Sequence, residues 1–450
     1  MAAPLKVLII GGGVAGPALA YWLSRLGNFT SITLAERSSS MRASGQQVDL
    51  RGQGVPMMQK MGIEAAVRAA VVHEVGMQLV DLHGHTKAFF PAAQTGDGRQ
   101  SFTSEYEIMR GDLVGILYGL TEGKGNVRHL FGTTVDALTQ DDPDVDDGKV
   151  HVRFRDGHDE DFDLVVGADG TSSKTRGMML GPDAPDPRVP LGGYIGYYSI
   201  ASRPGDSDRG TFCHLPGSVP RVIGTRKDCA DLTRVYMIMR GRDSYPGIDA
   251  AYKSGDLQQL RDAWADMYAD GGWETPRFTD ALRRAPEAAD FYCTPFEEVN
   301  LPKGDWSRGR VVLLGDAAHC QTAGGFGCTW GLIGAYVLAG EIASRLPKPG
   351  NKNNKVSSKK TITEAVVEGA KAYEEKFRPI ATANHGRTKS AGAALMFPTS
   401  SLGIRFLQAF ARVAAYFRMD QAVGWSDKTA AWELPHYPEL EGEEVGVGQN

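Results

Sequence analysis

The segment KVLIIGGGVAGPALAYWLSRLG, residues 6–27, decides the fold of this chain. KVLII is a continuous apolar run, as expected for a parallel strand that is covered on both faces. PALAYWLSRLG spaces its apolar side chains as a helix does, and SITLAER at residues 31–37 is typical of a second strand. Strand, helix and strand form a βαβ unit with a right-handed crossover. The sequence therefore predicts an α/β fold that begins with a Rossmann-like domain.

A glycine-rich loop joins the first strand to the helix, with the pattern G-x-G-x-x-G at Gly11, Gly13 and Gly16. The first glycine allows a tight turn, the second lets the backbone approach a pyrophosphate, and the third lets helix and strand pack closely. The phosphates would bind the unpaired N–H groups at the positive end of the helix, around Val14 and Ala15. Glu36, which ends the second strand, is placed to bind ribose hydroxyls. The loop predicts a dinucleotide site and leaves both NAD and FAD open.

Composition indicates a globular protein that is unrelated to nucleic acid. The chain has 450 residues, of which 42% are hydrophobic and 23% charged, and its net charge is −5. It contains no apolar run of the roughly 20 residues that a spanning helix needs, and we expect no stable membrane insertion. MAAPLK leads straight into a strand without the features of a secretory signal, so we expect a cytoplasmic protein. The five scattered cysteines favour neither disulfides nor a metal site.

The pattern of strands changes along the chain, which is too long for one ordinary core. Between residues 191 and 240, short aromatic and β-branched runs alternate with Gly, Pro and Asp, which indicates an antiparallel sheet. RVVLLGDAAH at residues 310–319 returns to the buried-strand pattern. We therefore predict three parts: a discontinuous nucleotide-binding domain over 1–185 and 286–385, a substrate-binding domain built on the antiparallel sheet over 186–285, and a helical segment over 386–450.

One apolar stretch of the C-terminal segment, LGIRFLQAFARVAAYF at residues 402–417, contains two arginines about two turns apart. Its length and its charges argue against a membrane span. We interpret it as a helix that packs on the domain interface, and a helix that lies on a membrane surface is the alternative.

Two later motifs resolve the choice of dinucleotide. DLVVGADGTSSKTR at residues 163–176 and GRVVLLGDAAH at residues 309–319 resemble the further fingerprints of FAD-dependent monooxygenases of the aromatic-hydroxylase type. This family includes para-hydroxybenzoate hydroxylase and the tetracycline-inactivating flavoenzymes. The resemblance implies FAD as the cofactor, NADPH or NADH as a transient co-substrate, and O2. It also implies hydroxylation of an aromatic or polycyclic molecule, such as a secondary metabolite or a tetracycline-like compound, through a flavin C4a-hydroperoxide.

The resemblance also assigns roles to individual residues of this chain, although no catalytic side chain is implied because the flavin performs the chemistry. The glycine loop and Glu36 would contact the pyrophosphate and the adenosine ribose, with Arg37 beside the adenosine. Asp316, in GDAAH, matches the aspartate that binds the ribityl chain of FAD. Asp169, in GADG, matches a motif associated with both FAD and the pyridine nucleotide.

Two more charged residues match cofactor contacts of the family. Arg110, in EIMRGDL, matches an arginine that reaches the ribityl and phosphate region. GQQVDLRGQG, residues 45–54, resembles the tetracycline-inactivating members most closely and suggests Asp49 as a further contact. A surface or interdomain ion pair remains the alternative for both residues.

The loop after GDAAH departs from the family. In CQTAGGFGCTWG, Gly325 and Gly327 supply the G-x-G that should lie beside the isoalloxazine ring, but Phe326 replaces the usual glutamine and no proline precedes it. This departure leaves open a non-oxygenating FAD enzyme, such as a dehydrogenase or a redox-neutral cyclase. A binding protein without FAD is a further alternative, against which the glycine loop argues.

The substrate should face the antiparallel sheet. By similarity to the tetracycline-inactivating relatives and by their position in the aromatic strands, we expect the substrate-binding side chains to be Gln47, Tyr197, Arg221 and Tyr236. Aromatic residues in a strand also commonly belong to a core, so packing remains the alternative role for the tyrosines.

Overall fold

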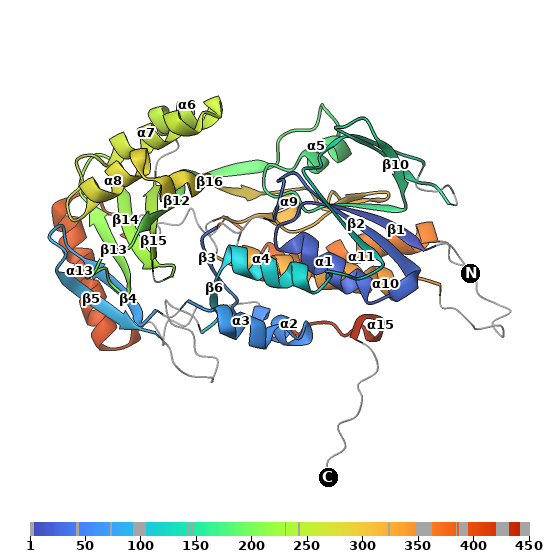
Figure 1. Cartoon of the computed structure of the whole chain (residues 1–450), viewed down its shortest axis with the longest axis horizontal. Helices are drawn as coiled ribbons and strands as arrows, with labels where there is room; N and C mark the ends of the chain where they lie inside the picture. Colours follow the sequence, from blue (N-terminus) through green and yellow to red (C-terminus); the bar gives the residue numbers. More distant parts are fainter. Residues whose placement is uncertain are drawn as a thin grey trace, which may run out of the picture.

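The computed structural model of the chain describes residues 4–41, 45–72, 74–92, 105–142, 145, 147–229, 231–241, 244–322, 325–347, 362–383, 385–386, 395–419 and 432–441. Two large sheets dominate it. One contains the N-terminal strand, and the other lies toward the opposite end of the molecule (Figure 1).

The first large sheet has six strands and confirms the predicted βαβ unit. In spatial order its strands are β17 (Ser307–Arg308), β18 (Val311–Leu313), β11 (Leu164–Gly167), β1 (Leu5–Ile10), β2 (Thr30–Glu36) and β7 (Val127–Phe131). All neighbours are parallel except β17 and β18. The apolar run of β1 is buried between β11 and β2, as a strand covered on both faces requires.

Helices cover this sheet. α1 (Ala15–Ser24) packs against α10 (Gly327–Ala343), which in turn packs against α11 (Ile362–Ala381). Almost every residue of α10 is buried because this helix is apolar all round and lies between its neighbours. The shorter helices of this part are α2 (Gly54–Lys60), α3 (Glu64–Ala70), α4 (Arg110–Gly119), α5 (Lys174–Leu180), α9 (Asp316–His319) and α15 (Pro438–Glu441).

The second large sheet has seven strands drawn from separate parts of the chain. In spatial order they are β16 (Tyr292–Val299), β12 (Arg188–Ala201), β15 (Leu232–Arg240), β14 (Arg221–Lys227), β13 (Gly210–Leu215), β4 (Gly76–Val80) and β5 (Thr86–Pro91). The pairs are antiparallel except β13 with β4. β4 and β5 come from a segment far ahead of β12 in the sequence, so this sheet is completed by residues outside the aromatic run.

One face of the seven-stranded sheet is covered by helices. α6 (Pro246–Ser254), α7 (Leu257–Tyr268) and α8 (Thr275–Arg284) lie over it, together with the 3-10 turn Pro286–Asp290 (Figure 1). Their apolar side chains meet those of the strands in a second core, which contains the buried rings of Trp264, Tyr268 and Phe278.

Two small sheets complete the fold. β10 (Asp159–Phe162), β9 (Val150–Phe154) and β8 (Val135–Gln140) form an antiparallel meander. β3 (Gln47–Asp49) pairs with β6 (Glu107–Met109), directly before α4. This short ladder lies between the two large sheets, and it carries several of the residues discussed below (Figure 1).

The described helices of the C-terminal segment pack on different parts of the molecule. α13 (Ser401–Tyr416) packs on β5 at the outer end of the seven-stranded sheet, whereas α15 packs on α10. The expected packing of residues 402–417 on the domain interface was therefore wrong. The buried face of α13 is narrow and meets the apolar side chains of β5, with Ala411 in one cluster with Ala88 and Phe90. Residues 387–394, 420–431 and 442–450 of the predicted segment lie outside the described ranges.

Candidate functional site

The glycine loop has the geometry that only glycine allows at two of its positions. Gly11 has a φ of +117°, and an added Cβ there would overlap the carbonyl of Ala168 on the neighbouring strand. A Cβ on Gly16 would overlap the carbonyl of Gly11. The loop is thus held close to β11 and to α1, which begins at Ala15, directly after Val14.

Gly13 differs from these two glycines because its surroundings are open. An added Cβ would meet only the tip of the flexible Arg110 side chain, at 3.3 Å. Among the described residues, no side chain caps the N-terminus of α1, and its first turn carries no acidic residue. The first N–H groups of this helix are therefore available to an anion, which fits a pyrophosphate.

The side chain of Glu36 lies next to this loop. Its Oε2 accepts a hydrogen bond from the N–H of Gly12 at 2.8 Å, and its Oε1 accepts one from the N–H of Ser38 at 2.8 Å. The side chain of Arg37 is exposed beside it. A carboxylate at the end of the second strand, held against the glycine loop, fits the binding of a ribose.

Arg110 and Asp316 lie at the N-termini of two different helices. Arg110 is the first residue of α4, and its side chain passes Gly45 to reach Gly13. Asp316 is the first residue of α9 and is reached by solvent, yet protein atoms surround it. Desolvation by the surrounding protein atoms raises the pKa of the Asp316 carboxyl group, and the positive charge of Arg110 opposes that shift. A guanidinium next to the glycine loop and a carboxylate on which its charge acts fit the phosphates and hydroxyl groups of FAD.

Among the described residues, two buried polar atoms without a hydrogen-bond partner lie near Arg110 and Asp316. Asp49 forms an ion pair at 2.6 Å through one oxygen with Arg51, two residues along the same segment. Among the described residues, the other oxygen, Oδ1, is buried without a hydrogen-bond partner, and so is Oγ1 of Thr329 in the first turn of α10. Buried polar atoms normally have partners, so these two atoms also fit a bound cofactor.

Three further predicted residues, Asp169, Gly325 and Gly327, lie in two different loops. Both carboxylate oxygens of Asp169 are engaged within its own loop, where they accept hydrogen bonds from Ser173 and Thr175. Asp169 therefore shapes the turn that touches Gly11. Gly325, with a φ of +73°, and Gly327 are exposed, and an added Cβ on Gly327 would lie 3.6 Å from Oδ1 of Asp316. The neighbouring residues 323 and 324 lie outside the described ranges.

Three tyrosines form a row across three strands of the seven-stranded sheet. Tyr197 of β12 is paired directly with Tyr236 of β15 on one side and with Tyr292 of β16 on the other. The rings of Tyr197 and Tyr236 meet edge to face, with centroids 5.0 Å apart. The N–H of Gln47 donates to the Tyr236 hydroxyl at 3.4 Å, which ties β3 to this face of the sheet. The tyrosine row therefore faces the short ladder that leads to Arg110.

Arg221 lies on the other face of that sheet. Gly224, not Arg221, is opposite Tyr236, so strand alternation directs Arg221 to the side of the helices. There its guanidinium pairs with Asp270 and donates to the carbonyl of Pro216. The structure thus brings Gln47, Tyr197 and Tyr236 together and separates Arg221 from them.

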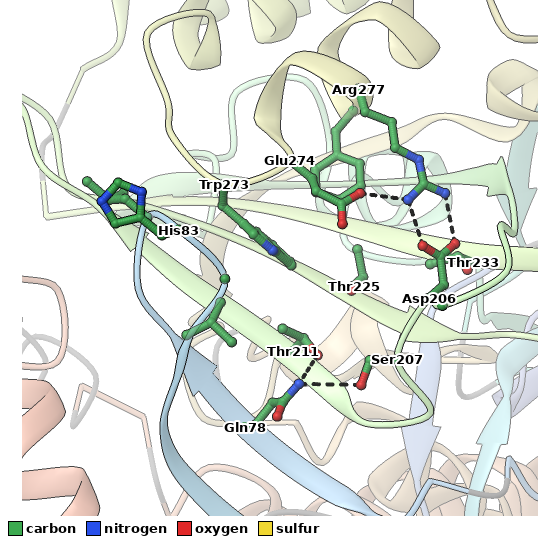
Figure 2. A pocket seen from close by; sticks show the side chains of 15 residues that line it. Gln78, His83, Asp206, Ser207, Thr211, Thr225, Thr233, Trp273, Glu274 and Arg277 are labelled. Carbon is green, nitrogen blue, oxygen red and sulfur yellow. Dashed lines mark hydrogen bonds and ion pairs between the residues drawn. The ribbon is translucent and has the colours of Figure 1, made fainter.

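A polar pocket of about 420 Å3 opens on this same helix side (Figure 2). Its polar side chains pair with one another. Arg277 binds Asp206 and Glu274, and the amide of Gln78 donates to Thr211 and Ser207. These contacts engage Arg277 and Gln78, and the sheet separates the pocket from the tyrosine row.

A buried cluster of charged residues lies next to the tyrosine row and was not predicted from the sequence. Arg226 of β14 binds Glu74 through both carboxylate oxygens, at 2.6 to 3.1 Å, and also pairs with Glu107 of β6. Glu107 is opposite Asp49 in the β3–β6 ladder. This cluster fastens the ladder that carries Asp49 to the seven-stranded sheet. Its charged residues stand at unrelated places in the sequence, so no local pattern could reveal it.

Glu107 provides a pH-dependent test of the cluster. Burial, reinforced by Asp49 and Glu74, raises the pKa of Glu107 to about 8, although Arg226 opposes the shift. The unfolded value is about 4.3, so the folded chain binds an extra proton between these two values and its stability falls as pH rises. We expect the free energy of unfolding of the wild type, relative to Glu107→Gln, to fall by up to ~1.4 kcal/mol per pH unit in this window. Urea unfolding at a series of pH values measures it, and parallel pH profiles would contradict the assignment.

Neither a metal centre nor a membrane span is found in the described ranges. No group of three or more His, Cys, Asp or Glu side chains there is arranged to hold a metal ion. No helix of that part of the chain combines the length and the apolar character needed to cross a bilayer.

Comparisons with known proteins agree with this geometry. Residues 4–181 match the model of the FAD binding domain family. The chain is 40% identical to the flavin-dependent monooxygenase eupH of Phoma sp over 96% of this chain and 98% of that protein. It is 36% identical to the FAD-dependent monooxygenase asL4 of Sarocladium schorii, over 97% and 99%.

Among solved structures, the tetracycline destructase Tet(55) superimposes with a TM-score of 0.72 at 26% identity, and the alignment covers 97% of this chain and 100% of that one. The predicted fold, an FAD domain joined to a sheet domain, is confirmed by this likeness. With its glycine loop, its match to the FAD binding domain family and its near full-length relatives, the chain belongs to the FAD-dependent monooxygenase family.

Proposed function

We propose that this enzyme hydroxylates an aromatic or polycyclic small molecule with NADPH or NADH and O2. The tyrosine row carries the proposal, because it presents aromatic surface toward the ladder that leads to Arg110 and Asp316. When bound, FAD would accept a hydride from the nicotinamide and activate O2, one atom of which enters the substrate while the other leaves as water. The relative Tet(55) is a tetracycline destructase by name, which favours a polycyclic substrate.

Each part of the site has a definite task in this proposal. The glycine loop would bind the pyrophosphate, Glu36 the ribose, and Asp316 the ribityl hydroxyls, while Arg110 would supply positive charge between them. Burial raises the pKa of Tyr236 to about 12, so its hydroxyl stays protonated at neutral pH. Tyr236 would therefore act as a neutral hydrogen-bond donor on the substrate side, and the row would exclude water there.

Oxygen labelling tests the proposal directly. The purified protein, loaded with FAD, is incubated with NADPH or NADH under 18O2 and a panel of phenolic and tetracyclic compounds. We expect substrate-stimulated oxidation of the nicotinamide and a product that is heavier by one 18O atom. Product formed without NAD(P)H or O2 would support the non-oxygenating alternative. Product that carries oxygen from water would contradict the proposal.

Tyr292 offers a test of the substrate wall. Its side chain is 46% exposed, so Tyr292→Leu should change stability little while removing an aromatic contact. We expect the KM for an aromatic substrate to rise about tenfold, as the loss of ~1.4 kcal/mol of binding would cause, with a smaller change in kcat. Tyr416→Leu, an exposed tyrosine at the end of α13, is the matched control and should leave both constants unchanged. An unchanged KM in Tyr292→Leu would place the substrate elsewhere.

A further inference from the structure

α13 presents an unusual outer surface. Sixteen large apolar side chains are exposed among the described residues, and eight of these lie between residues 395 and 417. The outer apolar face of α13 consists of Leu402, Phe406, Phe410, Val413 and Phe417, which are 78%, 69%, 56%, 52% and 68% exposed. Their spacing of three or four residues puts them on one side of the helix. A contiguous apolar surface of this kind marks an interaction site.

The opposite side of α13 already accounts for its attachment to the protein. Ile404, Leu407 and Ala411 are buried there, and the amide of Gln408 donates to the carbonyl of Val80 on β4 at 3.3 Å. The helix therefore has two apolar faces, and only the inner one packs on the sheet. The outer apolar face needs a separate explanation.

The positive charge beside the outer apolar face of α13 indicates what kind of partner would cover that face. Arg405 and Arg412 are exposed along one flank of the outer apolar face. Between residues 386 and 419 the sequence holds five Lys or Arg residues and no Asp or Glu, although the whole chain has more acidic than basic residues. A helix with aromatic and aliphatic residues on one side and arginines beside them is typical of segments that lie in the interface of a membrane. We propose that the outer apolar face of α13 docks on an anionic phospholipid bilayer.

The position of α13 permits this contact. It lies at the end of the molecule, on the edge strand β5 and away from the six-stranded sheet (Figure 1). The helix has 16 residues and two arginines within it, so it would lie along the surface and not span the bilayer. A second copy of the chain fits less well. Two α13 helices face to face would oppose arginine with arginine, and the helix carries no carboxylate to compensate.

Vesicle flotation with the purified full-length protein tests the docking. We expect binding to vesicles of phosphatidylcholine with phosphatidylserine that weakens as salt is raised, and much weaker binding to phosphatidylcholine alone. The pair Phe406→Ser and Phe410→Ser should weaken binding at least tenfold, and the pair Arg405→Gln and Arg412→Gln should do so roughly tenfold on anionic vesicles only. The matched control changes two exposed apolar side chains elsewhere, Phe29→Ser and Leu257→Ser, and should bind as the wild type does.

A fluorescence measurement places the contact on the helix itself. In a Phe410→Trp variant, the added tryptophan emission should shift to the blue when anionic vesicles are present. FAD content and circular dichroism establish that each variant is folded. Absence of wild-type vesicle binding, or full binding by the Phe406/Phe410 variant, would overturn the proposal. A concentration-dependent dimer that the same variant abolishes, without lipid binding, would identify a second copy as the occupant.

Discussion

Gly13→Ala should lose FAD affinity by at least about tenfold while the protein remains folded. The added methyl group would meet only the tip of Arg110, so the loop itself tolerates it. The same methyl group would obstruct the approach of the backbone to the pyrophosphate at the start of α1. The dissociation constant of FAD, titrated by flavin fluorescence on the deflavinated protein, measures the effect, and thermal unfolding of that protein checks the fold.

Two other glycines provide the controls. Gly115 lies within α4 with open space around it, so Gly115→Ala should leave FAD affinity unchanged and stability equal or higher. Gly11→Ala should damage the fold itself, because its Cβ would overlap the Ala168 carbonyl at a φ of +117°. Unchanged FAD affinity in Gly13→Ala would show that the pyrophosphate does not bind at this loop.

Arg226→Met should lower the free energy of unfolding by about 3 to 5 kcal/mol. The side chains of Glu74 and Glu107 are only 1% and 3% exposed. At neutral pH the raised pKa keeps most of Glu107 protonated, so the substitution would leave mainly the Glu74 carboxylate buried without its partner. Urea unfolding of the wild type and the variant at neutral pH measures the loss. The predicted effect is large because desolvated charges cannot be compensated by solvent.

A rescue variant and a control variant test whether buried, unpaired charge causes the loss of stability in Arg226→Met. Adding Glu74→Gln and Glu107→Gln to Arg226→Met should recover much of the lost stability, because neutral amides are less costly to bury. Arg153→Met breaks a pair with Asp159 in which both side chains are at least 60% exposed, and should cost less than about 1 kcal/mol. If Arg226→Met lost no more stability than Arg153→Met, the buried cluster would contribute little.

The cluster also matters for the site, because it connects the two halves of the molecule. Glu107 lies three residues before Arg110, and Arg226 lies two residues beyond Gly224, the glycine opposite Tyr236, and so on the same face of the sheet. A loosened cluster would let the β3–β6 ladder move relative to the tyrosine row. Variants of Arg226 that fold should therefore raise the KM for the aromatic substrate as well as lower stability.

Local patterns were sufficient for the first half of the site. The βαβ unit, the glycine loop and Glu36 lie within about thirty residues, and each follows from strand and helix periodicity together with the steric freedom of glycine. The strand and the turn before Asp316 can be predicted from the same kind of local pattern. Each of these patterns is contiguous in the chain, whereas the family resemblance supplied the roles expected of Arg110 and Asp316 and the identity of the ligand.

The substrate half depended on strand register, which a sequence does not display. Tyr197 and Tyr236 were expected, but Tyr292 joins them only because β16 pairs with β12 in one particular register. Arg221 was expected beside Tyr236 and lies on the opposite face, since a difference of one residue in strand position reverses the direction of a side chain.

The sequence by itself determined the Rossmann-like start, the dinucleotide loop and the membership of a flavoenzyme family, because these properties reside in short segments. The tertiary structure alone decided three things: the position of Tyr292 beside Tyr197, the burial of Arg226 between two glutamates, and the exposure of the outer face of α13. Each of these results from packing between segments far apart in the chain, where neighbours are set by register and burial and not by sequence distance.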